Sequence, residues 1–193
     1  MDISNQIIHL FLLGFLGVVI FVLIIKLKHY YDLSQIDELT SIKNYRGFQR
    51  MIRKATAKNK KNGKEFSFAI FDIDEFRNYN LESYAFGDCV LKEFVKFIKS
   101  ELPEDACVAR FKFGDEFIVM LHSDLISATE KINFVQKKCR ENSFLDSKNQ
   151  RNFRISFSYG TALFDKNTDT IESLLDRTEK ALKESKKNLV KSN

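Results

Sequence analysis

Several residue types that mark particular protein classes are scarce in this chain of 193 residues, which contains no tryptophan, one proline, seven glycines and three cysteines. So little proline and glycine excludes a collagen-like rod, and a hydrophobic fraction of 44% excludes a disordered tail. Cys89, Cys107 and Cys139 are odd in number and widely spaced, which excludes a disulfide scaffold and gives no zinc pattern. The simplest interpretation is reduced thiols in the cytosol. The net charge of +5 is compatible with an anionic ligand or a membrane partner but establishes neither.

Charged and polar side chains are also missing from residues 10–25, and Ile7 and Ile8 extend this apolar run to residues 7–25. At about 1.5 Å per residue, the run matches the roughly 30 Å hydrocarbon layer of a bilayer. A core helix would show a polar face, and a cleaved signal peptide would have basic residues before the run. We therefore expect an uncleaved transmembrane anchor over residues 1–27, embedded through residues 7–25.

The charges around the apolar run predict its orientation. Lys26 and Lys28 flank only its C-terminal end, so the positive-inside rule places the remainder in the cytoplasm, at the inner membrane, after a single pass. Residues 28–36 have apolar positions at helical spacing and are expected to form a stalk, followed by one domain over residues 37–193. The lysine-rich segment 54–64 is interpreted as a solvated helix end and loop, with contact to anionic lipid headgroups as the alternative.

The order of apolar patterns after residue 37 predicts an α/β or α+β sandwich, a central mixed sheet with helices on both sides. Strands are expected at 66–72, at 107–111, at 117–121 and at 153–159. Helices are expected at 81–101, at 125–140 and at 171–182.

Acidic side chains lie at the ends of these predicted strands. Asp72 and Asp74 close the first strand, and Asp115 and Glu116 lie in the turn between two others. Carboxylates at the end of a buried strand are costly unless they are paired, hydrogen-bonded or bound to a cation, and such oxygen ligands suit Mg²⁺ or Mn²⁺. From these residues alone, strand-end solubility or turn capping is the alternative.

A set of segments, in the same order along the chain, resembles the motifs of the GGDEF domain of diguanylate cyclases. The segments are DELTSIKNYRGF at 37–48, FDIDEFR at 71–77 followed by Asn80, GD at 87–88, FGDEF at 113–117, SFSYG at 156–160, and EKAL at 179–182 with Lys186. The resemblance extends from residue 37 to about residue 188.

This resemblance implies an activity and a metal site. Diguanylate cyclases join two GTP molecules into cyclic di-GMP and release pyrophosphate, with one GTP on each subunit of a homodimer. By resemblance, Asp72, the backbone carbonyl of Ile73 and Asp115 would bind Mg²⁺ or Mn²⁺. Glu116 would assist in metal binding or activate the attacking hydroxyl, so that Asp115 and Glu116, together with Lys186, would be catalytic.

The resemblance also implies how the substrate is bound. Asn80 and Asp88 would hydrogen-bond the guanine edge, and Lys186 would act on the terminal phosphates as a point charge. From the residues alone, Asn80 has the alternative role of a helix cap, and Lys186 that of a solvated surface lysine. No nucleic-acid partner is expected.

Two departures from the family pattern leave other functions open. Phe113 replaces the first glycine of the signature after an inserted Lys112, and the chain between Asn80 and Asp88 is one residue short. One alternative is an inactive GGDEF-like module that binds GTP or a protein partner. The other is a related nucleotide cyclase with a different cyclic product.

Overall fold

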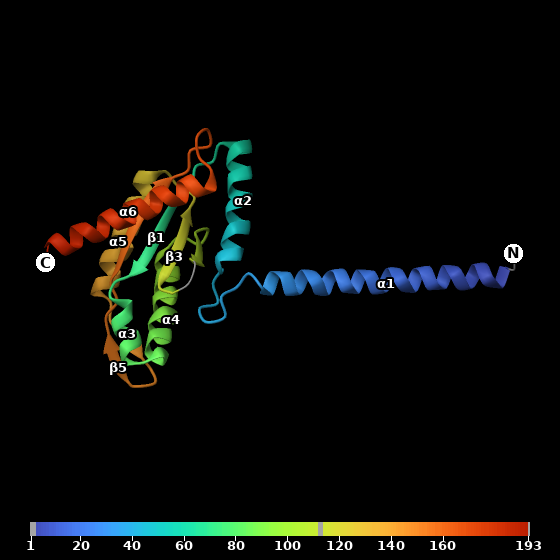
Figure 1. Ribbon diagram of the computed structural model, residues 1–193, viewed down its shortest axis with the longest axis horizontal. Coiled ribbons are helices and arrows are strands. Elements are labelled where there is room, and N and C mark those ends of the chain that lie inside the picture. Colours follow the sequence, from blue (N-terminus) through green and yellow to red (C-terminus); the bar gives the residue numbers. More distant parts are fainter. Residues whose placement is uncertain (1–2, 112–113, 193) are drawn as a thin grey trace. The chain divides into compact units, whose positions relative to one another are not determined.

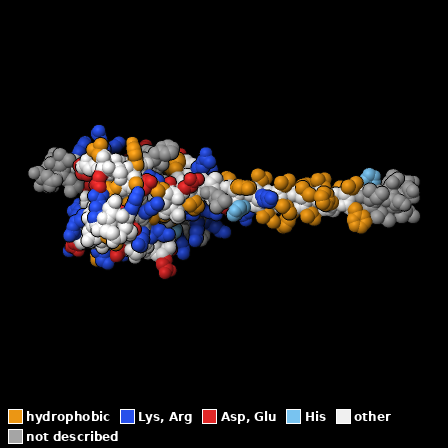
Figure 2. All heavy atoms as spheres, turned by 90° about the horizontal axis from the view of Figure 1, so that it is seen from below, with side chains coloured by type: hydrophobic (Ala, Val, Ile, Leu, Met, Phe, Trp, Pro, Cys, Tyr) orange, Lys and Arg blue, Asp and Glu red, His pale blue; other side chains and the backbone are white. Residues whose placement is uncertain are grey.

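The structure, a computed structural model, describes residues 3–111 and 114–192 and divides the chain into two compact units, Met1–Ile36 and Asp37–Asn193. The first unit is formed by a single helix, α1 (Ile3–Leu33) (Figure 1), and its described side chains from Phe11 to Ile25 are mostly exposed hydrophobic groups (Figure 2). By its length and composition, the 22-residue stretch Phe11–Asp32 could cross a membrane. The helix continues from the predicted anchor into the predicted stalk and ends at Leu33, and the boundary between anchor and stalk at residue 27 stays a prediction.

The second unit is built on a four-stranded sheet with the order β2-β3-β1-β6. The strands are β1 (Ser67–Ile73), β2 (Cys107–Arg110), β3 (Glu116–Leu121) and β6 (Phe157–Leu163). Each pair of neighbours is antiparallel, and a parallel bridge between Lys43 and Ala109 adds the segment before the first helix of this unit. The predicted hairpin around Gly114 and Asp115 is thus confirmed as β2 and β3.

Helices cover both faces of this sheet because the side chains of β1 alternate between the two faces. Phe68 and Ile70 pack into one apolar core with α2 and α6, and Ala69 and Phe71 pack into the other with α3, α4 and α5. The helices are α2 (Tyr45–Asn62), α3 (Phe76–Glu82), α4 (Tyr84–Glu101), α5 (Leu125–Glu141) and α6 (Ile171–Ser192). The predicted class, a central sheet with helices on both sides, is confirmed (Figure 1), with its four strands paired antiparallel where a mixed sheet was expected.

The helix expected over residues 81–101 is confirmed as α4 from Tyr84 onward, while residues 81 and 82 end a separate helix, α3, that was not predicted. Ser83 lies between them in extended backbone, with φ −168°, and its side chain accepts a hydrogen bond from the amide of Phe86 at 3.1 Å. A serine side chain that caps the start of one helix favours an extended backbone at its own position, which ends the helix before it. The spacing of apolar residues carries no information about such a cap.

The strand expected over residues 153–159 is also divided. Phe153 ends β5 (Arg151–Phe153), which pairs with β4 (Phe144–Asp146) in a separate two-stranded sheet, and β6 begins only at Phe157. Between them the guanidinium of Arg154 donates to the carbonyls of Arg140 and Glu141 at the end of α5. The chain leaves one sheet there and enters the other, although its alternation of apolar and polar residues continues.

The last helix, α6, packs directly on β6 at Gly160. A side chain at this glycine would overlap backbone atoms of Thr178, Ala181 and Leu182. Only glycine allows the helix to approach the strand so closely. This contact holds α6 across one face of the sheet, where its later residues reach the end of β1 (Figure 1).

Candidate functional site

Two acidic residues face each other where β1 ends and β3 begins. Asp72 and Glu116 are direct partners in the antiparallel register, a position in which Cβ atoms are typically about 4.5–5.5 Å apart. Asp72 lies two positions after Ile70 and therefore on the face of the sheet that α6 covers. Two like charges in such a pair are unfavourable unless a cation lies close to them.

A third acid, Asp115, immediately precedes β3. Its backbone carbonyl accepts a hydrogen bond from the amide of Ile73 at 3.3 Å, which fixes the turn against the end of β1. Burial raises the pKa of the Asp115 carboxyl, and the negative charge of Asp72 raises it further, while Lys186 and Arg110 offset part of the shift. Asp72 and Asp115 are therefore close enough to repel each other.

Lys186 supplies a positive charge at this strand end. Its Nζ lies 2.6 Å from Oδ1 of Asp72, and the side chain of Asp72 is only 13% exposed. Lys186 itself is 43% exposed, so its ammonium group also faces solvent. The structure thus brings together Asp72, Asp115 and Lys186, which the sequence analysis had selected from three separate motifs. We call Asp72, Asp115, Glu116 and Lys186 the acidic strand end.

The acidic strand end fits a divalent cation that arrives with a phosphate ligand. Within residues 3–111 and 114–192, no three His, Cys, Asp or Glu side chains lie close enough to hold a metal by themselves. Mg²⁺ commonly uses one or two carboxylates and completes its shell with substrate phosphates and water. The repulsion between Asp72 and Asp115 is the electrostatic situation that such a cation relieves. The metal, and the roles of Asp72, Ile73, Asp115 and Glu116 in binding it, stay predictions.

The two residues expected at the guanine edge lie on neighbouring helices. Asn80 is in α3, and a Cβ added at Gly87 in α4 would overlap its amide group. Asp88 follows Gly87 directly and is exposed. Asn80 lies inside its helix, so the alternative role of a helix cap is wrong. The short spacing between Asn80 and Asp88 is accommodated by the single residue Ser83 between the helices.

Arg110 is a residue of this site that the sequence analysis missed. Its Nε donates to the carbonyl of Gly114 at 2.9 Å, and its Nη1 donates to both carboxylate oxygens of Asp37 at 3.2 Å. Gly114 has φ +109°, a conformation that favours glycine. Arg110 therefore ties the signature turn to the first residue of the second unit. Asp37 belongs to the first quoted motif, but its pairing with Arg110, 73 positions away, leaves no local pattern in the sequence.

The Arg110–Asp37 pair is reinforced by donors in the turn that follows Asp37. The hydroxyl of Thr40 donates to Oδ1 of Asp37 at 2.6 Å, and its amide donates to the same oxygen at 2.9 Å. Partial burial alone would raise the pKa of Asp37, but these hydrogen bonds and the charge of Arg110 outweigh burial and lower it. The carboxylate is thus held in its ionised form.

Asp74 has a structural partner. Its Oδ1 accepts a hydrogen bond from the hydroxyl of Ser158 at 2.7 Å, and its amide donates to the carbonyl of Ser156 at 3.0 Å. These bonds join the end of β1 to β6. The altered signature residues Lys112 and Phe113 lie outside the described residues.

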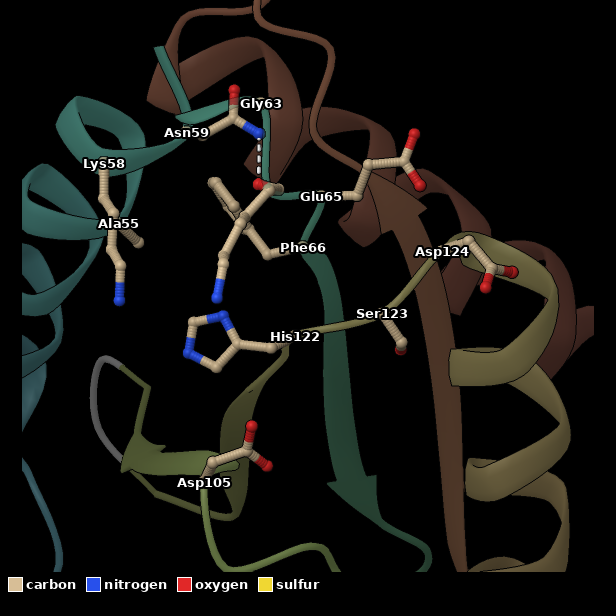
Figure 3. Close-up of a pocket in the computed structure, with 11 residues that line it drawn as sticks. Ala55, Lys58, Asn59, Gly63, Glu65, Phe66, Asp105, His122, Ser123 and Asp124 are labelled. Atoms are coloured by element: carbon tan, nitrogen blue, oxygen red, sulfur yellow. Dashed lines mark hydrogen bonds between the residues drawn. The ribbon is translucent and has the colours of Figure 1, made fainter. Parts of the chain in front are cut away.

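A hollow of about 750 Å³ lies at the opposite end of the sheet (Figure 3). At that end Ser67 pairs with Leu121, five register positions from the pair of Asp72 and Glu116. At about 3.3 Å per residue, the two ends are roughly 17 Å apart. The hollow is lined by Ala55, Lys58, Asn59, Gly63, Lys64, Glu65, Phe66, Asp105, His122, Ser123 and Asp124. It is therefore separate from the acidic strand end.

The comparisons with known proteins identify the family. Residues 34–191 match the profile described as "Diguanylate cyclase, GGDEF domain". The chain belongs to the GGDEF family. This GGDEF protein is 32% identical over 166 residues to Diguanylate cyclase A of Treponema denticola. The aligned residues cover 85% of this chain and 40% of that relative.

A second relative is described as a membrane protein. It is an uncharacterized membrane protein of Staphylococcus saprophyticus, 24% identical over 134 residues, which cover 69% of this GGDEF protein and 37% of the relative. The chain thus spans about two fifths of the length of the curated relatives it matches.

Solved structures confirm the fold of this GGDEF protein. The coiled coil and GGDEF domain of DgcB from Caulobacter crescentus, solved in complex with c-di-GMP, has a TM-score of 0.79 at 20% identity, covering 91% of this chain and 93% of that one. Diguanylate cyclase SiaD from Pseudomonas aeruginosa, in complex with its activator SiaC, has a TM-score of 0.74 at 22% identity, covering 96% of this chain and 71% of that one. At such identities the likeness shows the fold alone.

Proposed function

We propose that this GGDEF protein is a diguanylate cyclase that condenses two GTP molecules into cyclic di-GMP and releases two pyrophosphates. The observation that carries the proposal is the acidic strand end: Glu116 is the register partner of Asp72, the carbonyl of Asp115 accepts from the amide of Ile73 next to Asp72, and Nζ of Lys186 lies 2.6 Å from Asp72. A purely structural role would not require like charges to gather at one strand end in a GGDEF fold.

The proposed reaction forms two phosphodiester bonds. The 3′ oxygen of each GTP attacks the α-phosphorus of the other, and the bond from that phosphorus to the departing pyrophosphate breaks. Glu116 accepts the proton of the attacking hydroxyl, either directly or through water. When bound, Mg²⁺ or Mn²⁺ neutralises charge on the phosphates. Asp72 and Asp115 are the carboxylates proposed to hold it, together with the backbone carbonyl of Ile73.

Lys186 is proposed to bind the phosphates that leave. Its ammonium group is held at the acidic strand end by Asp72 and faces solvent on its other side. A lysine acts on a triphosphate as a mobile point charge, so the same group can pair with Asp72 before GTP binds and with the β- and γ-phosphates afterwards.

Asn80 and Asp88 are proposed to select guanine. A carboxylate accepts the N1–H and the exocyclic N2–H of guanine together, and the other bases do not present this pair of donors. The amide group of Asn80 occupies the space that a side chain at Gly87 would fill, so Asn80 lies close to the residue that precedes Asp88.

The reaction requires two GTP molecules that face each other, and each subunit is proposed to bind one. We therefore propose a homodimer in which two acidic strand ends meet. The helix α1 is proposed as a single-pass anchor in the cytoplasmic membrane, with the GGDEF domain in the cytoplasm. This part is supported by the candidate span Phe11–Asp32, by Lys26 and Lys28 directly after the apolar run 7–25, and by relatives described as membrane proteins.

Product analysis tests the proposal. The full-length protein, purified in detergent, is incubated with GTP and Mg²⁺ or Mn²⁺, and the products are identified by mass spectrometry. We expect cyclic di-GMP and pyrophosphate, lost in Asp115→Ala and retained in Asp105→Ala, which changes an exposed acid at the other end of the sheet.

Other outcomes identify the alternatives. GTP-dependent stabilisation without a product indicates an inactive binding module. A different cyclic nucleotide indicates a related cyclase. If neither GTP nor ATP shifts the melting temperature and no product forms, the proposal is wrong.

A further inference from the structure

The positive charge of the chain is concentrated in one helix. Residues 45–64, which are α2 and the two residues after it, contain eight Lys or Arg and no Asp or Glu. In the rest of the chain, acidic residues outnumber basic ones by three. The net charge of +5 is therefore a property of this segment and not of the protein as a whole.

The basic residues of α2 lie on the side opposite to its buried face. Phe48, Ile52 and Asn59 recur at helical spacing and are buried against the sheet. The exposed residues occupy the other side of the helix and its C-terminal end. We call these exposed residues the basic face: Arg46, Arg53, Lys54, Lys58, Lys61 and Lys64.

The charges of the basic face have no acidic partners among the residues that the structure describes. Elsewhere in the domain, basic side chains are often paired, as Lys138 is with Glu101 and Lys186 is with Asp72. None of the ion pairs between described residues involves the basic face. A solvated helix that only needs solubility usually mixes both signs of charge.

The basic face continues into the hollow at the far end of the sheet. Lys58 and Lys64 line this hollow, and His122 adds a third basic side chain from the end of β3 (Figure 3). Three acids, Glu65, Asp105 and Asp124, line the same hollow. The hollow of about 750 Å³ is therefore mixed in charge, and the positive charge of this region lies on the exposed side of α2.

The position of α2 in the chain indicates what the basic face binds. Only residues 34–44 separate α2 from α1, which contains the candidate membrane span. Eleven residues reach at most about 40 Å, so α2 stays near any membrane that holds α1. Anionic lipids give the cytoplasmic leaflet a negative surface potential that attracts clusters of Lys and Arg. Because α1 keeps α2 near the bilayer, the local concentration of lipid headgroups around α2 is high. A polyanion in solution has no such tether to the protein.

We propose that the basic face of α2 docks on the anionic phospholipid headgroups of the membrane that holds α1. The proposal rests on the proposed anchor and not on cyclase activity. Docking fixes the orientation of the GGDEF domain against the bilayer and so limits how two domains meet.

Hydrogen–deuterium exchange tests this docking. The full-length protein is reconstituted in nanodiscs of phosphatidylcholine alone or with 30% phosphatidylglycerol added as the probe. We expect amides of α2 to exchange about fivefold more slowly in the anionic nanodiscs, and the difference to vanish in 0.5 M salt because salt screens exposed charges. Amides of α4 and α5 are expected to exchange equally in both.

Two charge-matched variants control the experiment. Lys54→Gln, Lys58→Gln, Lys61→Gln and Lys64→Gln together are expected to abolish the protection of α2. A second variant changes four exposed lysines outside α2, namely Lys92, Lys99, Lys148 and Lys166, to glutamine and is expected to retain it. The proposal is overturned if the amides of α2 exchange equally in both kinds of nanodisc, or if both variants lose the protection of α2 to the same extent.

Two further outcomes separate the alternatives. Protection of α2 by an added RNA oligonucleotide but not by phosphatidylglycerol overturns docking on lipid in favour of a nucleic-acid surface. A chain that does not incorporate into nanodiscs overturns the anchor, and docking is then measured as co-sedimentation of the same protein with phosphatidylglycerol vesicles. Absence of co-sedimentation contradicts docking as well.

Discussion

Lys186, on the last helix, forms an ion pair of 2.6 Å with Asp72 at the end of the first strand. The pair joins residues 114 positions apart and depends on the close packing of α6 on β6 at Gly160. The same lysine is proposed to bind the phosphates of GTP. In this account, Lys186 pairs with Asp72 in the absence of GTP and with the phosphates of GTP once the nucleotide binds.

Replacing Lys186 separates its role in binding from a role in stability. Lys186→Met is expected to raise the KM for GTP about tenfold, because a charge on the phosphates is lost. The free energy of unfolding is expected to fall by only about 1 kcal/mol or less, since the lysine is half exposed to solvent. Steady-state kinetics and urea unfolding measure the two effects. Lys183→Met, an exposed lysine on the same helix, is the control, and an equal rise in KM for both variants would contradict the assignment.

Gly160 connects the packing of the fold to the site. Gly160→Ala places a methyl group against backbone atoms of Thr178 and Leu182, so α6 has to move. We expect a loss of about 1–3 kcal/mol in the free energy of unfolding and a larger fractional loss of cyclase activity, because Lys186 moves with the helix.

Gly63→Ala is the matched control for this substitution. Gly63 has φ +67°, but nothing lies within 4 Å of the added Cβ. It is therefore expected to cost about 1 kcal/mol without affecting KM for GTP. A Gly160→Ala protein of normal stability and activity would show that α6 does not position the site.

The raised pKa of Asp115 indicates that its carboxylate lowers the stability of the fold while serving the proposed activity. Its ionised form is disfavoured in the folded state by burial and by Asp72, so this carboxylate lowers stability at pH 7. Asp115→Asn is expected to increase the free energy of unfolding by less than about 1 kcal/mol at pH 7, with the gain vanishing below the ordinary aspartate value of 3.8. The same variant loses activity. Urea unfolding at several pH values measures the gain, and a variant that is less stable than the original at pH 7 contradicts this account.

The lowered pKa of Asp37 predicts the opposite pH dependence. The Arg110–Asp37 pair stabilises the fold fully above the ordinary value of 3.8, and this stabilisation is lost as pH falls further through the lower pKa of the folded state. Arg110→Gln is expected to cost about 1–3 kcal/mol at pH 7 and progressively less below pH 4. It is also expected to lower kcat, because Arg110 holds the carbonyl of Gly114 in the signature turn.

Arg110→Lys tests the geometry of this pair. A lysine keeps the charge but cannot donate to both Gly114 and Asp37 in the fixed geometry of a guanidinium. We expect a kcat close to that of Arg110→Gln. Full activity of Arg110→Lys would show that only the charge matters.

Local patterns in the sequence predicted much of the fold. The continuous apolar run of β1, the two strands around Gly114 and the helical spacing of α5 and α6 are each confirmed by the structure. The strands bring their terminal acids together because antiparallel pairing places the end of β1 beside the start of β3. This is why Asp72 and Asp115 could be selected before the structure was considered.

The features that were missed depend on contacts that no local pattern records. Ser83 caps α4 and so moves the start of a predicted helix from residue 81 to Tyr84, although the apolar spacing begins earlier. The strand around Phe153 is divided because Arg154 turns to the end of α5. Arg110 joins Asp37 across 73 positions, so neither residue alone indicates the pair.

The central claim is that Asp72 and Asp115 hold a divalent cation against the triphosphate of GTP. The most direct measurement is a crystal structure of the protein with Mn²⁺ and a non-hydrolysable GTP analogue, in which an anomalous difference map locates the metal. We predict a peak about 2.0–2.3 Å from carboxylate oxygens of both residues and in contact with a phosphate. A nucleotide bound elsewhere, or manganese at another position with the ion pair of Lys186 and Asp72 intact, would contradict the account.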